Sequence, residues 1–250
     1  MSTSIYMSTL GFPVTTEQDF RHYAYETTEF GHKIETRNGS YTYWIIGNGI
    51  ELWVQTNHHK RLLGMNPHFS GSTRMPVSIT ARLPRYERNI LEGAFYAWAT
   101  PQISNVETNL FPFVFDLPDY DVYDPLELPR SVTIQLAAFA NNLQGFENEE
   151  AYMASPSGKT KLTSKSFIPS GLFTLRKGMR LPAQAQAVFS GQVLDTEMII
   201  NPVTMLKFYW ARLNTLLGEI DLVADPQVVQ GKIVKHGIIH GEFWLSGRIM

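Results

Sequence analysis

The sequence predicts a β-dominated α+β protein, in which an α+β domain is followed by a small five-stranded β-barrel. Three observations predict this class: one early segment has helical spacing, most later segments alternate with a period of two, and turn residues recur between them. The 250 residues are 44% hydrophobic and 18% charged. Such a composition is typical of a folded globular protein and excludes disorder over most of the length.

Charge and cysteine content exclude several functional classes. The chain has 21 basic and 23 acidic residues, so the molecule as a whole is not a polycation for nucleic acid. It has no cysteine, which excludes disulfides, thiolate metal sites and cysteine nucleophiles. The first ten residues carry no charge and do not resemble a signal peptide, and no apolar run approaches the roughly 20 residues of a spanning helix. We therefore expect a soluble, cytoplasmic protein without a membrane partner.

The first expected element is a helix over residues 15–30. Thr15 and Thr16 offer an N-cap, and Asp19 places negative charge in the first turn, where the helix dipole favours it. Aromatic and small residues then recur at helical spacing until Gly31 ends the helix.

Beyond this helix the hydrophobic period changes to two. Gly47-Asn48-Gly49 separates two segments rich in Tyr, Trp, Ile and Val, which predicts a β-hairpin with a tight turn. A second helix is expected over residues 137–152, although Asn and Gly residues interrupt it. The strands expected before the barrel are 40–46, 50–56, 76–83, 93–99, 111–116 and 131–139.

The distribution of charge along the chain predicts a domain boundary. Residues 1–150 contain 10 basic and 17 acidic residues, residues 151–194 contain 6 and 0, and residues 195–250 contain 5 and 6. The middle stretch is also rich in Ser, Thr, Gly and Pro, which are typical of turns and linkers. We therefore predict an α+β domain over 1–155, a basic connector over 156–182 and a barrel over 183–250.

The final part of the chain predicts five short strands separated by turn residues. Five strands in an open sheet would leave exposed edges, and closure into a small barrel removes them. The expected strands are 187–198, 206–215, 219–224, 231–239 and 242–249.

Three of these segments carry a resemblance to a known fold. Phe189–Val193, Gly218–Ala224 and Gly241–Arg248 resemble the first, third and last strands of an OB-fold barrel. The resemblance covers about the last quarter of the chain and implies an OB-like barrel. The family usually places a helix between its third and fourth strands, and residues 225–231 are too few to hold a good one.

Two binding functions are open for this barrel, and neither requires catalysis. Alternation assigns Lys207 and Tyr209 to one face of a strand, and Trp244 and Arg248 to one face of another. The preferred prediction is that this aromatic face contacts a protein partner or a second copy of the chain. The alternative is single-stranded nucleic acid, which needs rings for stacking and cations for phosphates. The large rings could also simply fill the barrel. The candidate residues are Lys207, Tyr209, Trp210, Arg212, Trp244 and Arg248.

A metal-dependent enzyme is the third alternative. His58, His59 and His68 lie within eleven residues, and Glu51 lies just upstream, so two histidines and one carboxylate could form a site. Adjacent histidines on an extended segment point to opposite sides, however, which favours exposed loop histidines instead. The sequence has no Gly-x-Ser-x-Gly and no His-Glu-x-x-His motif. We therefore assign no catalytic residue and expect no cofactor.

Overall fold

The computed structural model describes residues 6–85, 89–99, 111–155, 162–173, 175–176, 179–180 and 183–250. It confirms a β-dominated α+β fold with few helices. Within these ranges no helix is both long and apolar enough to cross a membrane.

The expected first helix is α1 (Glu17–Phe30), and its N-terminus explains its position. The Thr16 side chain accepts the backbone N–H of Asp19, and the Asp19 carboxylate accepts the N–H of Thr16. This reciprocal pair satisfies two backbone donors that a helix start otherwise leaves free. The helix buries Tyr23, Ala24 and Thr27 on one side.

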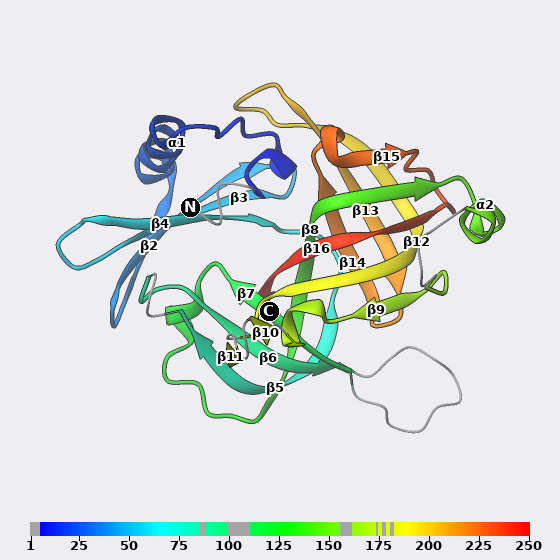
Figure 1. The fold of residues 1–250 in the computed structure, drawn as a ribbon. Helices are drawn as coiled ribbons and strands as arrows, with labels where there is room; N and C mark the ends of the chain where they lie inside the picture. Colours follow the sequence, from blue (N-terminus) through cyan, green and yellow to red (C-terminus); the bar gives the residue numbers. More distant parts are fainter. Residues whose placement is uncertain are drawn as a thin grey trace.

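A four-stranded antiparallel sheet lies beneath α1 (Figure 1). The predicted turn is confirmed: Gly47, Asn48 and Gly49 all have positive φ, which is the conformation of a tight hairpin turn. The strands follow the chain order and are β1 (His32–Thr36), β2 (Gly39–Gly47), β3 (Ile50–Thr56) and β4 (Leu62–Phe69).

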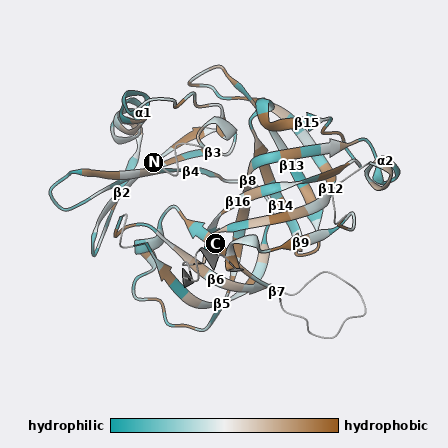
Figure 2. Cartoon of the chain, in the orientation of Figure 1, coloured by the Kyte–Doolittle hydropathy of each residue, from teal (hydrophilic) through white to brown (hydrophobic). Residues whose placement is uncertain are grey.

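The larger sheet has ten strands, and hydrophobic and hydrophilic residues alternate along several of them (Figure 2). Its strands are β5 (Met75–Pro84), β6 (Gly93–Ala99), β7 (Phe111–Leu117), β8 (Arg130–Phe146), β9 (Ser166–Ile168), β12 (Gln186–Ile200), β13 (Lys207–Thr215), β14 (Gly218–Ala224), β15 (Val229–Gly231) and β16 (Ile238–Ile249). The remaining elements are α2 (Glu149–Ala154), the pair β10 (Leu175–Arg176) and β11 (Met179–Arg180), and the 3-10 turns η2 (Ser8–Leu10), η3 (Tyr120–Tyr123), η4 (Ser170–Phe173) and η5 (Pro226–Val228).

Strand pairing in this sheet forms two closed circuits that share β8 and β16. The C-terminal circuit runs β12–β13–β14–β8–β16 and returns to β12, with β14 and β8 parallel. The central circuit runs β8–β5–β6–β7–β16 and is closed by the pair Ser246 and Asp116. The C-terminal strands therefore differ from the expected arrangement in one respect. They do not close on themselves, because β14 pairs with β8 from outside residues 183–250.

Two predicted elements are wrong. Residues 137–152 are not a helix, since β8 continues to Phe146 and only α2 follows it. Ala137–Ala140 lies between neighbouring strands and is buried on both faces, so its apolar run lacks the alternation of a half-exposed strand. Residues 231–239 are not one strand either: β15 ends at Gly231, and left-handed backbone at His236 precedes β16.

The predicted connector lies partly outside the described residues, which omit 156–161, 174, 177–178 and 181–182. Within the described part, β9 joins the ten-stranded sheet by pairing with β12. The N-terminal segment is also part of the main core: Met7, Leu10 and Phe12 are fully buried, and η2 contacts β13 and β14.

Candidate functional site

The six candidate binding residues do not form one surface. Lys207 and Tyr209 lie at the start of β13, whereas Trp244 and Arg248 lie on β16, and β12 runs between these two strands in the C-terminal circuit. Lys207 is exposed and Tyr209 half-buried. The cations and rings that the sequence placed together therefore belong to separate environments.

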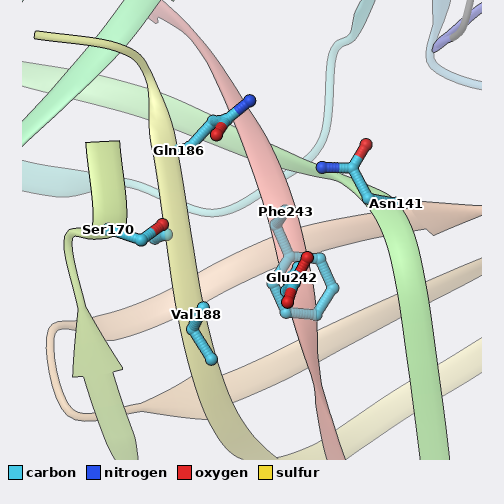
Figure 3. Close-up of a pocket in the computed structure, with 7 residues that line it drawn as sticks. Asn141, Ser170, Gln186, Val188, Glu242 and Phe243 are labelled. Atoms are coloured by element: carbon cyan, nitrogen blue, oxygen red, sulfur yellow. The ribbon is translucent and has the colours of Figure 1, made fainter. Parts of the chain in front are cut away.

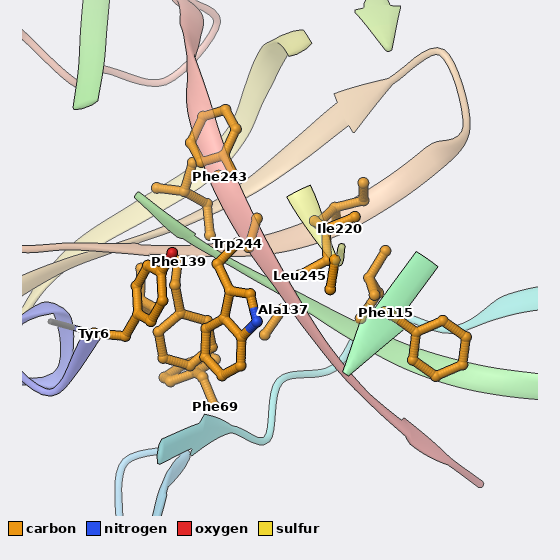
Figure 4. Close-up of a cluster of buried hydrophobic side chains, with 14 of the residues drawn as sticks. Tyr6, Phe69, Phe115, Ala137, Phe139, Ile220, Phe243, Trp244 and Leu245 are labelled. Atoms are coloured by element: carbon orange, nitrogen blue, oxygen red, sulfur yellow. The ribbon is translucent and has the colours of Figure 1, made fainter. Parts of the chain in front are cut away.

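Trp244 is part of the core. Its side chain is only 6% exposed, and its ring stacks on Tyr6 with 4.6 Å between centroids (Figure 4). Phe139 contacts the ring at 4.9 Å, and the indole N–H donates to Asp116 at 2.7 Å. A nucleic-acid base has no access to either face of this indole.

Trp210 and Arg212 also contact other residues of the chain. The indole N–H of Trp210 donates to the fully buried carboxylate of Asp221 at 3.0 Å. Arg212 lies 3.8 Å from Glu219 on the neighbouring strand β14. Both side chains thus help to hold β13 against β14.

The end of the β12–β13 hairpin, by contrast, exposes apolar side chains. Met198, Ile200, Met205 and Leu206 are 38, 43, 68 and 45% exposed. Met198 lies opposite Tyr209 in the strand register, and Ile200 lies opposite Lys207. We call this group the hairpin surface: Met198, Ile200, Met205, Leu206, Lys207 and Tyr209. Contiguous exposed apolar residues next to polar ones are typical of interaction sites.

The hairpin surface is held in place from beneath. Asn201 is fully buried; its amide donates to the Leu10 carbonyl at 2.8 Å, and its side-chain oxygen accepts the N–H of Val203 at 2.9 Å. The Thr204 hydroxyl donates to the Gly11 carbonyl at 2.6 Å. The N-terminal segment thus fixes the loop, and the apolar side chains above it need little ordering before they contact a partner.

The metal candidates are not brought together. Glu51 and His68 are neighbours across β3 and β4 and are buried, while His58 and His59 lie in the exposed turn between these strands. The His58 ring contacts the Arg37 carbonyl at 3.0 Å instead. Among the described residues, no three His, Asp or Glu side chains are placed to hold a metal ion.

His68 belongs to a buried chain of hydrogen bonds that the sequence did not indicate. Its Nδ1 lies 2.9 Å from Ser246 Oγ, and its Nε2 lies 2.9 Å from Gln135 Oε1. Gln135 in turn donates its amide N–H to Asp221 at 3.4 Å. Because Gln135 donates through nitrogen, its oxygen accepts from His68 Nε2–H, and His68 Nδ1 then accepts the Ser246 hydroxyl proton. The hydrogen bonds therefore all run in one direction, from the hydroxyl of Ser246 to the carboxylate of Asp221.

This hydrogen-bonded series of side chains contains a hydroxyl, an imidazole and a carboxylate, but no substrate can reach it. Ser246 is 1% exposed, and His68 and Asp221 are fully buried. Burial, with the nearby Arg248 cation second, lowers the pKa of His68 to about 3, so the imidazole is neutral at pH 7. The arrangement stabilises the contact between the two sheets. Sequence reasoning missed it because its members come from β4, β8, β14 and β16.

Arg248 makes a second contact between the sheets. Its guanidinium lies 3.5 Å from Glu51, 3.4 Å from Asp119 and 4.8 Å from the centre of the Trp53 ring. The pKa of Asp119 is raised by burial, which Arg248 partly offsets. Arg248 is thus already paired and stacked, and it offers little to an external phosphate.

A small pocket opens on the wall of the C-terminal circuit (Figure 3). Its volume is about 230 Å³, and Asn141, Gln186 and Glu242 place polar groups around Phe243. Asn141 is the extra residue of a β-bulge in the pairing of β8 with β16. The pocket is smaller than the roughly 300 Å³ at which small-molecule sites begin.

Comparison with known proteins adds no assignment: no family model, curated protein or solved structure matches the chain. The likeness to OB-fold barrels remains a prediction from strand pattern.

Proposed function

We propose that this protein is a non-catalytic binding protein that contacts a second copy of itself through the hairpin surface. One observation carries the proposal: four large apolar side chains, Met198, Ile200, Met205 and Leu206, remain exposed on a hairpin whose loop is fixed by buried Asn201. Exposed apolar area on a preorganised element favours association, because its burial stabilises the complex at low entropic cost.

A second copy is the simplest partner for this surface. In a two-fold dimer the same patch contributes from both sides, so the apolar group of one hairpin covers that of the other. Lys207 lies at the edge of the patch, where a cation stays solvated and opposes unlimited stacking.

Sedimentation velocity over a range of protein concentrations tests this function. We expect a reversible dimer in the wild type and a dissociation constant at least tenfold weaker in Ile200→Asp/Met205→Asp, since each carboxylate must be desolvated on association. Val122→Asp is the control, because Val122 is an apolar residue that is 40% exposed in η3, outside the β12–β13 hairpin.

A wild type that stays monomeric at every concentration contradicts the proposal. So does a dimer that weakens in the Val122→Asp control and not in the double variant. Titration of a labelled oligonucleotide at two salt concentrations examines the nucleic-acid alternative separately, because phosphate contacts give salt-dependent binding.

A further inference from the structure

A second candidate site lies between α1 and the four-stranded sheet. A groove of about 430 Å³ opens there, within the range of small-molecule sites. One stripe of α1 forms its wall, and strands β1 to β4 form its floor. Its lining residues are Arg21, Ala24, Tyr25, Thr28, Gly31, Lys33, Thr42, Val54, Thr56, Lys60 and Leu62.

The charged side chains that line the groove are all basic. Arg21, Lys33 and Lys60 contribute three cations, and the lining contains no carboxylate. Val54 and Leu62 give an apolar floor, Ala24 adds an apolar side chain from the wall, and threonine and tyrosine side chains add hydroxyl groups around them. A ligand with an apolar body and a negative group matches both features.

Two of the three cations have exposed acidic neighbours. Arg21 pairs with Glu17 on the same helix, and Lys33 pairs with Glu35 on the same strand. Exposed pairs of this kind contribute little to stability and exchange readily with another anion. Among the described ion pairs, none includes Lys60.

The backbone at Lys60 supplies an independent observation. Lys60 has a φ of +60°, the left-handed conformation in which glycine is the default residue. The turn is fixed by Asn57, whose side-chain oxygen accepts the N–H groups of His59 and Arg61. A lysine therefore occupies a position where glycine suits the backbone better, and its side chain lines the groove. Unfavourable local conformations of this kind are concentrated at binding sites.

We propose that this groove binds a small organic anion with a planar apolar body, and that Lys60 neutralises its negative group. The ligand class is a carboxylate or sulfonate carried on a ring system. The apolar floor contacts the ring, and the cations at the opening contact the anionic group.

Chemical-shift titration with 2-naphthoate as the probe tests this site and locates it. We expect saturable binding at about 0.1–1 mM, as suits a ligand of this size, with shifts concentrated at residues of the groove. The neutral analogue 2-naphthalenemethanol binds at least fivefold more weakly. Raising the salt concentration to 0.5 M weakens naphthoate binding and leaves the alcohol unchanged.

Three variants separate a ligand-binding role from a structural one. Lys60→Gln weakens naphthoate binding about threefold, the effect of one partly exposed charge. Lys60→Gly weakens binding at least as much and raises the midpoint of urea unfolding, because it relieves the left-handed strain. Thr28→Trp, at an exposed helix position, fills the groove and weakens binding at least tenfold.

Lys235→Gln is the control, since Lys235 is an exposed cation outside both the groove and the hairpin surface, and it leaves naphthoate binding unchanged. Equal affinity for naphthoate and its alcohol overturns the proposal. Unchanged binding in folded Thr28→Trp, or shifts centred outside the groove, also overturns it.

Discussion

At the residue scale, His68 is a closely held side chain of the interior. It is fully buried between Ser246 and Gln135, and both ring nitrogens are hydrogen-bonded. Protonation would place a charge in this interior, close to the guanidinium of Arg248, and would turn the acceptor Nδ1 into a second donor. Burial first, and the Arg248 charge second, explain why the pKa of His68 falls to about 3 in the folded state.

A pH dependence of stability follows from this pKa. The unfolded chain binds a proton at His68 below about pH 6.5, whereas the folded chain binds it only near pH 3, so acid favours unfolding between these values. We expect the unfolding free energy of the wild type to fall more steeply than that of His68→Gln, by about 1.4 kcal/mol per pH unit between pH 6 and 4.

Urea denaturation of both proteins at pH 7, 6, 5 and 4 measures this difference. The variant keeps a donor and an acceptor at this position but does not match the shape of the imidazole, so we expect it to be less stable at pH 7. The two curves then converge as the pH falls. Parallel curves would show that His68 titrates alike in the folded and unfolded states.

At the element scale, the β12–β13 hairpin depends on Asn201. This amide joins the hairpin loop to the N-terminal segment through the Leu10 carbonyl and organises the loop through the N–H of Val203. Removing it leaves the carbonyl of fully buried Leu10 and the N–H of half-buried Val203 without this partner, and such a loss costs a buried polar group on the order of 1–3 kcal/mol.

We therefore expect Asn201→Ala to lower the free energy of unfolding by about 2–3 kcal/mol, as measured by urea denaturation. Asn214→Ala is the matched control, because Asn214 is half-exposed on β13, and its effect stays within about 0.5 kcal/mol. Equal effects of the two substitutions would mean that the buried amide does not secure the loop.

At the scale of the whole molecule, β8 and β16 link the two circuits into one sheet. Their ladder runs from Ile134 opposite Ile249 to Phe146 opposite Ile238. Residues 183–250 alone lack β8, so β14 and β16 would each present an unpaired, apolar edge. The pairing of β8 with β14 and β16 therefore joins residues 183–250 to an earlier part of the chain within one sheet.

A fragment of residues 183–250 tests this interdependence. We expect it to show neither dispersed amide resonances nor a cooperative thermal transition, whereas the full chain unfolds in one transition. Circular dichroism melting and an amide correlation spectrum measure both. A fragment that melts cooperatively would instead support the independent barrel domain that the sequence predicts.

Local patterns in the sequence determined much of the fold. The cap at Thr16 and the spacing after it predicted α1, and the Gly47–Gly49 turn predicted the β2–β3 hairpin. Alternation likewise located β5, β6, β12 and β13 to within a few residues. These features depend on neighbours in the chain, which a sequence displays directly.

Only the tertiary structure decided which strands pair and which side chains remain exposed. Trp244 is buried because Tyr6, from the opposite end of the chain, stacks on it, and β14 pairs with a strand some eighty residues earlier. The groove beside α1 likewise needs a helix and four strands to bring its cations together. Contacts between distant segments depend on packing of the whole chain, and periodicity within one segment does not encode them.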